Sequence, residues 1–137
     1  EVYECLVKDY AMPSSDTCGY EKGEGHPQIA GSFPRYLRKM VREKKLLSLE
    51  EAVYKATLLP ATLFGFEEKG CIEPGMDGDL TVFSLEEICD KADYPHRGEP
   101  DAKPLGIPYV FVDGKCVVEK GEYRNTRSGK TIRKQEK

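Results

Sequence analysis

The spacing of apolar residues changes near residue 66, and this change limits the folds that the chain can adopt. Before it, Tyr36, Leu37, Met40 and Val41 recur at intervals that place them on one face of a helix. After it, short apolar runs alternate with glycine, proline and aspartate, which is typical of strands joined by turns. We therefore predict an α/β chain with helices in its first half and strands in its second.

The predicted helices have recognisable ends. Ser32 is a candidate N-cap with Pro34 in the first turn, and Ser48 with Glu51 forms a capping box. Gly65 is expected to close the last helix of this half. The helix that follows the capping box has an apolar stripe that we predict to be buried, formed by Leu49, Ala52, Val53, Ala56 and Leu59.

Shorter signals predict the remaining segments. Residues 1–9 have the spacing of the end of a helix, and residues 10–12 form an apolar run that we interpret as a short buried strand. Residues 80–83 are predicted to form another strand. Asp113-Gly114 is a strong hairpin signal between two further strands. Residues 90–106 are rich in charge, proline and glycine and predict a long surface loop.

Charge and hydropathy argue against several kinds of partner. The 137 residues include 21 basic and 24 acidic side chains, interspersed, for a net charge of −3, whereas nucleic-acid binding favours a basic face. No apolar run approaches the ~18 residues of a membrane span, and no signal peptide is recognisable. We therefore predict neither a nucleic-acid nor a membrane partner. Basic residues do gather in the tail, which we expect to be solvated: Arg124, Arg127, Lys130, Arg133, Lys134 and Lys137.

The cysteines bear on the cellular compartment of the protein, and the first residues bear on whether the sequence is part of a longer one. Five cysteines are dispersed without a Cys-x-x-Cys pair, which predicts reduced thiols in a cytoplasmic protein. The sequence starts without Met, inside a helical apolar pattern, so we expect a fragment of a longer protein. A processed terminus is the alternative.

The candidate for chemistry is Asp16, which follows Ser15 where the first predicted strand ends. Catalytic residues of α/β barrels lie at the C-terminal ends of strands, so this carboxylate is a possible general acid or base. The alternative is an ordinary turn former, since aspartate is common in such turns. Cys18 invites a nucleophile hypothesis, which we disfavour because no general-base histidine is identifiable beside it. His96, in the charged loop, is expected to be exposed.

Three motifs resemble the C-terminal part of metal-dependent amidohydrolases, and among them the N-acyl-D-amino-acid deacylases (D-aminoacylases). The first is Ser-Asp16 followed by Gly-His-Pro (25–27) and Gly-Ser-Phe-Pro-Arg (31–35). The second runs from Leu-Ser-Leu-Glu-Glu-Ala-Val (47–53) to Leu-Pro-Ala (59–61). The third is Gly-Cys-Ile-Glu-Pro-Gly-Met-Asp-Gly-Asp-Leu-Thr-Val-Phe (70–83), which many amidohydrolases share. The first motif is the narrower one and indicates the D-aminoacylase branch.

The resemblance implies a zinc-containing (β/α)8 barrel that hydrolyses a linear amide such as an N-acyl-D-amino acid, with a small β-sandwich beside it. Residues 1–66 would hold the end of the barrel (its last strand and the following helices), residues 67–123 the sandwich strands, and residues 124–137 the basic tail. Asp16 would occupy the position of the aspartate that contacts the metal-held water, acting as a metal ligand and as general acid/base on that water.

The sequence departs from the family pattern in two ways. The upstream metal ligands of the family have no counterpart, since His26 and His96 are the only histidines. Gln28 stands where many D-aminoacylases have an arginine taken to hold the substrate carboxylate, and we expect the loss of that bidentate cation to weaken carboxylate binding at this position. His26, Gln28 and Arg35 remain the candidate substrate-binding residues, each with a purely structural alternative.

Other functions stay open at this point. A dihydroorotase-like cyclic amide hydrolase or a deaminase would share the third motif. A non-catalytic interaction domain is a further alternative, because exposed edge strands favour self-association or pairing with another chain.

Overall fold

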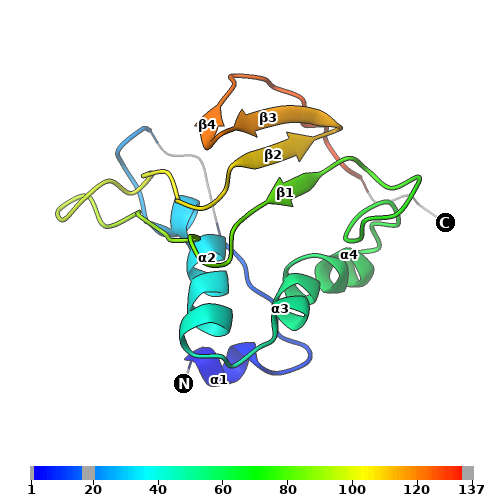
Figure 1. The fold of residues 1–137 in the computed structure, drawn as a ribbon, viewed down its shortest axis with the longest axis horizontal. Helices are drawn as coiled ribbons and strands as arrows, with labels where there is room; N and C mark the ends of the chain where they lie inside the picture. Colours follow the sequence, from blue (N-terminus) through cyan, green and yellow to red (C-terminus); the bar gives the residue numbers. More distant parts are fainter. Residues whose placement is uncertain (1, 17–20, 134–137) are drawn as a thin grey trace.

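The computed structural model describes residues 2–16 and 21–133, in which helices lie beneath a small antiparallel sheet (Figure 1). Cys18 lies outside these residues. The helical elements are α1 (Val2–Leu6), α2 (Gln28–Leu37), the π-helical turn η1 (Arg38–Glu43), α3 (Leu49–Ala56) and α4 (Leu58–Phe64). The strands are β1 (Leu80–Val82), β2 (Tyr109–Val112), β3 (Lys115–Glu119) and β4 (Glu122–Tyr123).

The sheet is a four-stranded antiparallel meander in the order β1-β2-β3-β4. The predicted hairpin is confirmed: Asp113 and Gly114 both have positive φ (52° and 71°), as a tight two-residue turn between β2 and β3 requires. The predicted strand at residues 80–83 is confirmed as β1, which lies at an edge of the sheet with all three residues exposed. The order of helices before strands is therefore as predicted.

The helical core confirms the apolar periodicity of the first half. Tyr36, Met40, Leu47 and Ala52 form a buried cluster, against which Leu37 and other apolar side chains pack. The capping box is present: Ser48 Oγ accepts from the Glu51 N–H (3.1 Å), and Glu51 Oε2 accepts from the Ser48 N–H (2.8 Å). Gly65 ends α4 in the left-handed conformation (φ 75°), as predicted. The predicted stripe is only partly correct, because Val53 is exposed.

The predicted strand at residues 10–12 is wrong within the described residues. This segment has no strand partner, and the Tyr10 side chain is 79% exposed. Its backbone groups bond locally instead, since the Ala11 N–H donates to the Lys8 carbonyl (3.0 Å). The buried Lys55 ammonium also donates to the Lys8 and Ala11 carbonyls, so α3 holds the segment as a turn.

Helix α2 begins earlier than predicted. Its N-cap is Pro27, whose φ of −60° already suits a helix, so Ser32 is not a cap and Pro34 lies in the interior. The loop at residues 90–106 is also less superficial than predicted, because Ala92 and Pro100 are buried in it. Among the described residues, no helix has the length and apolar character needed to cross a membrane.

Candidate functional site

Helix α2 presents one polar face to a recess of about 240 Å³. Counted from Gln28, the residues Gly31, Ser32 and Arg35 lie three, four and seven positions later, so all four share a face of the helix. The loop at residues 90–106 supplies the other wall of the recess. The lining residues are His26, Pro27, Gln28, Gly31, Ser32 and Arg35 from the α2 region, and Asp93, Tyr94 and Arg97 from the loop.

His26 joins the two walls of the recess. Its Nδ1 accepts the Gln28 backbone N–H (3.1 Å), so that nitrogen carries no proton and Nε2 does. Nε2 therefore donates to the Tyr94 hydroxyl (3.0 Å), and the two rings meet edge to face at 4.9 Å. Both imidazole nitrogens are thus occupied by bonds within this chain, which leaves neither of them open as a metal ligand in this arrangement.

Asp16 lies beside the recess without lining it. Its backbone is left-handed (φ 48°), and its N–H donates to Ser14 Oγ (3.3 Å). Gln28 Nε2 donates to the Asp16 backbone carbonyl (3.0 Å), which ties the Asp16 turn to the first residue of α2. The Asp16 side chain is exposed. Gln28 therefore lines the recess and is also hydrogen-bonded to the predicted catalytic residue, Asp16.

Arg35 is held by a buried carboxylate. Its Nε donates to Asp90 Oδ2 (2.7 Å), while Arg38 Nε and Nη2 donate to Asp90 Oδ1 (2.9 and 2.7 Å). The Asp90 side chain is only 4% exposed. Burial by itself raises the pKa of Asp90, but the hydrogen bonds from Arg38 and Arg35 outweigh it and hold that pKa below its usual range. Asp90 is therefore an anion that fixes Arg35 at the recess.

The sequence alone does not identify the loop residues Asp93, Tyr94 and Arg97 as part of this recess. Arg97 Nη2 donates to Asp93 Oδ1 (2.8 Å), and the Arg97 guanidinium lies 5.2 Å from the centre of the Tyr94 ring. A cluster of tyrosine, histidine and arginine in one loop was visible in the sequence. Its proximity to α2 was not, because the contact joins residues about 68 apart, as in the His26–Tyr94 bond. His96 is exposed, as predicted.

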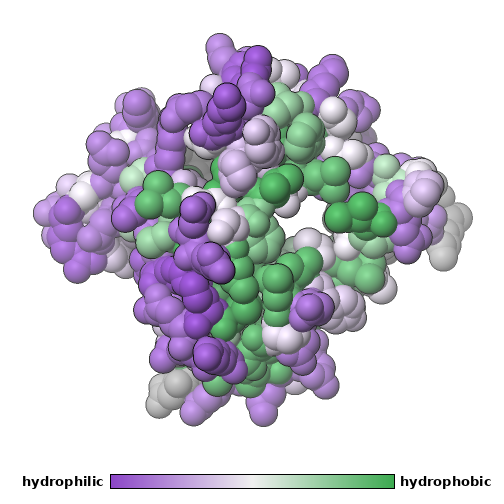
Figure 2. All heavy atoms as spheres, in the orientation of Figure 1, coloured by the Kyte–Doolittle hydropathy of each residue, from purple (hydrophilic) through white to green (hydrophobic). Residues whose placement is uncertain are grey.

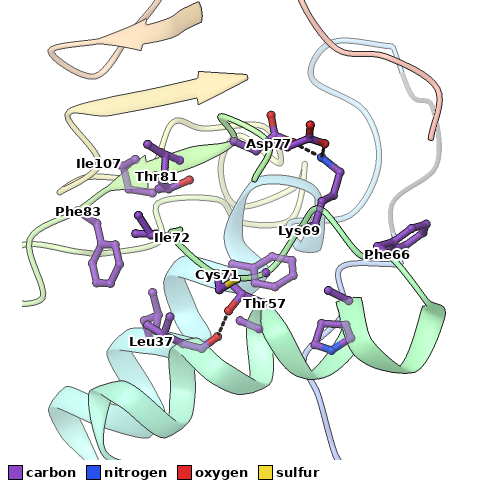
Figure 3. Close-up of a pocket in the computed structure, with 18 of the residues that line it drawn as sticks. Leu37, Thr57, Phe66, Lys69, Cys71, Ile72, Asp77, Thr81, Phe83 and Ile107 are labelled. Atoms are coloured by element: carbon purple, nitrogen blue, oxygen red, sulfur yellow. Dashed lines mark hydrogen bonds and ion pairs between the residues drawn. The ribbon is translucent and has the colours of Figure 1, made fainter. Parts of the chain in front are cut away.

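A larger recess of about 570 Å³ lies on the opposite face of α2, between helices α2–α4 and β1. Figure 3 shows its apolar lining, with Leu37, Ile72, Phe83 and Ile107 around the space and the ion pair of Lys69 with Asp77 (2.8 Å) at one side. Apolar side chains gather around this hollow in Figure 2 as well. None of the predicted site residues lines it. We therefore take the smaller, polar recess as the candidate site.

Within the described ranges, no three His, Cys, Asp or Glu side chains come together as a metal site. The four described cysteines (Cys5, Cys71, Cys89 and Cys116) are free thiols. The metal-binding side chains of these described residues therefore do not form a zinc site by themselves. Asp16 is one exposed carboxylate, and His26 is engaged elsewhere.

Comparison with known proteins decides the family. A model described as "Amidohydrolase family" matches residues 12–118. The chain belongs to the amidohydrolase family. It is 38% identical over 130 residues to an N-acyl-D-glutamate deacylase of Alcaligenes xylosoxydans xylosoxydans, covering 95% of this chain and 24% of that enzyme. A D-aminoacylase of the same organism is 33% identical over 132 residues, covering 96% of this chain and 26% of that enzyme.

A solved amidohydrolase structure agrees with this assignment. The N-acyl-D-glutamate deacylase of Bordetella bronchiseptica, complexed with zinc and a phosphonate inhibitor, superposes with a TM-score of 0.63 at 42% identity. The match covers 67% of this chain and 19% of that one. The chain thus spans about a quarter of the length of the curated relatives that it matches. The predicted resemblance to amidohydrolases of the D-aminoacylase branch is confirmed.

Proposed function

We propose that this chain is the C-terminal portion of a zinc-dependent amidohydrolase that cleaves the amide bond of an N-acyl-D-amino acid. The observation that carries the proposal is the family match over residues 12–118, which includes Asp16 and the whole polar recess. The similarity to an N-acyl-D-glutamate deacylase and a D-aminoacylase supports a linear amide as the substrate. A small-molecule substrate also suits a recess of about 240 Å³.

In this proposal Asp16 moves the proton during hydrolysis. Its carboxylate accepts a proton from the attacking water as the water oxygen bonds to the amide carbon. The same proton passes to the leaving nitrogen when the carbon–nitrogen bond breaks, so Asp16 ends the cycle ionised. The exposed side chain is accessible to substrate, and the bond from Gln28 to the Asp16 carbonyl fixes its backbone beside the recess.

Zinc would be held mainly by residues outside this chain. The described residues do not form a zinc site, whereas the related deacylase structure contains zinc. Our proposal therefore gives this chain the Asp16 carboxylate and the recess, and assigns the remaining ligands to other parts of a longer polypeptide. The same proposal places residues 1–66 at the end of a hydrolase barrel and residues 67–123 in a small β-sandwich.

The test is amide hydrolysis by the complete polypeptide, assayed with N-acetyl-D-amino acids, their L-enantiomers and a cyclic amide. We expect zinc-dependent release of acetate from the D-substrates, and a loss of about 100-fold or more in Asp16→Asn, because general acid–base catalysis contributes at least that factor. Asp9→Asn, an exposed aspartate of the same segment, is the matched control and should keep full activity. Full activity in Asp16→Asn would refute the role of Asp16, and hydrolysis of the cyclic amide alone would refute the substrate class.

A further inference from the structure

Two arginines from distant parts of the sequence line the polar recess, and each is anchored through one nitrogen only. Arg35 donates its Nε–H to the buried Asp90, and Arg97 donates from Nη2 to Asp93. No other described residue accepts from either guanidinium. Their side chains are 56% and 57% exposed, so the remaining N–H groups are accessible from the recess. Such groups are available to a ligand.

The anchoring of Arg97 fixes the orientation of its guanidinium. Asp93 holds one nitrogen at 2.8 Å, and the Tyr94 ring supports the guanidinium, whose central carbon lies 5.2 Å from the ring centroid. Tyr94 is itself bonded to His26 on the other wall. An arginine held in this way loses little side-chain entropy when it binds a second partner, which favours ligand binding.

The charged side chains that line the recess determine which charge a bound ligand should carry. Among the lining side chains, Arg35 and Arg97 are cationic and Asp93 is anionic. The backbone N–H of Tyr94 and then the Arg97 guanidinium lower the pKa of Asp93, so it remains ionised. An ionised Asp93 repels a doubly charged anion such as phosphate more strongly than a single carboxylate. Because a guanidinium also matches a planar carboxylate with two parallel bonds, the recess favours a small monocarboxylate.

We propose that Arg97 is a specificity-determining residue, which binds the substrate carboxylate from the loop wall while Arg35 faces the same recess from α2. The identity of that substrate, an N-acyl-amino acid, rests on the proposed function above. Gln28 cannot form a charge-assisted pair with a carboxylate, because its side-chain amide is neutral and one of its two N–H groups already donates to the Asp16 carbonyl. The loop at residues 90–106 thus supplies substrate selection, and the Asp16 turn supplies proton transfer.

The experiment compares one acid with its uncharged analogue. N-acetyl-D-alanine and N-acetyl-D-alanine amide are titrated calorimetrically into the complete polypeptide carrying Asp16→Asn, which prevents turnover. Arg97→Gln should weaken binding of the acid about tenfold and leave binding of the amide unchanged, since a charge-assisted bond is removed only for the acid. Arg97→Lys keeps the positive charge but loses the planar guanidinium that can make two parallel bonds, so its affinity for the acid should lie between those of the unmodified Arg97 protein and Arg97→Gln. Arg127→Gln removes an exposed arginine outside the recess and should change neither affinity.

The outcomes separate this inference from the proposed function. In the active polypeptide, Arg97→Gln should raise KM for the acid with little change in kcat, because the carboxylate contact is the same in the ground and transition states. Equal effects of Arg97→Gln on the acid and the amide, or no effect on either, would overturn the assignment of Arg97 even if hydrolysis is observed. If acetate is never released but acid binding still depends on Arg97, hydrolysis is refuted and the carboxylate site stands.

Discussion

Replacing Asp90 by asparagine should destabilise the protein, because this carboxylate joins α2 and η1 to the loop at residues 90–106. Asp90 accepts hydrogen bonds from Arg35 (2.7 Å) and from two nitrogens of Arg38 (2.9 and 2.7 Å). Asparagine keeps the shape and one oxygen but removes the charge. The Arg38 side chain, only 17% exposed, would then lack its buried counter-ion.

The size of this effect follows from burial. Removing one partner of a buried ion pair costs about 3–5 kcal/mol. Two features reduce this cost. The Arg35 side chain is more than half exposed and can be hydrated, and Arg38 keeps its ion pair with Glu43 at 2.5 Å. We therefore expect the free energy of unfolding to fall by about 2–3 kcal/mol, below the full value for a buried pair. With an m value of ~1.5 kcal/mol/M in urea, the midpoint would fall by about 1.3–2 M.

Urea unfolding followed by circular dichroism at 222 nm, at pH 7, measures this shift. Asp93→Asn is the matched control, because Asp93 lies in the same loop and also pairs with an arginine, at 2.8 Å, but its side chain is 44% exposed. We expect no resolvable change in its midpoint. An Asp90→Asn urea midpoint equal to that of the unmodified protein would refute the reasoning. It would mean that the buried ion pairs of Asp90 contribute no more to the free energy of unfolding than an exposed ion pair does.

The pH dependence of the same comparison provides a second check. The pKa of Asp90 is lower in the folded state than in the unfolded chain, so its stabilising contribution is complete above the unfolded value of ~3.9. That contribution is lost as the pH falls through the folded-state pKa, below ~3.9. The difference between the unmodified protein and Asp90→Asn should therefore be constant from pH 5 to pH 7 and shrink in stronger acid. A difference that grows on acidification would contradict the assignment.

Two further substitutions test the local geometry. Gly106→Ala should cost about 3 kcal/mol in urea unfolding, because φ is +75° and an added Cβ would lie 2.6 Å from the Glu87 carbonyl carbon. Gly114→Ala has a similar φ (+71°) but nothing within 4 Å, so a cost as large as that of Gly106→Ala would show that the clash is unimportant. Lys55→Met should speed amide hydrogen exchange at Ala11, because the segment loses the ammonium that holds its carbonyls. Unchanged exchange at Ala11, with Ser48→Ala as a control that weakens α3 elsewhere, would contradict this role of Lys55.

Local signals in the sequence were sufficient for much of the fold. The capping box at Ser48, the closing Gly65 and the Asp113-Gly114 turn each depend on bonds or dihedral angles within a few residues, and all three are present. The strand expected at residues 10–12 failed for the converse reason, because a strand exists only with a partner elsewhere. The Lys55 ammonium instead donates a hydrogen bond to a backbone carbonyl of this segment, that of Lys8. Nothing in the local sequence indicates that Lys55 is buried.

The candidate site could be predicted on one wall only. The motifs around α2 predict His26, Gln28 and Arg35 as site residues, and all three line one recess. The other wall comes from a loop whose composition predicted only exposed surface. Its position depends on long-range contacts, among them those from His26 to Tyr94 and from Arg35 and Arg38 to Asp90. Those pairings are tertiary, so the spacing of residues along the sequence does not specify them.

Helix α2 explains why the site and the core are coupled. Its residues Phe33, Pro34 and Leu37 line the apolar recess, while Gln28, Gly31, Ser32 and Arg35 line the polar one. Because the two sets lie on different faces of one ten-residue helix, a rotation of α2 that repacked the apolar face would also displace Arg35 and the Gln28 bond to Asp16. Asp90 opposes such a rotation, since it fixes Arg35 and Arg38 from the loop side. The same buried carboxylate should therefore contribute both to the stability of the fold and to the position of Arg35 relative to the proposed catalytic Asp16.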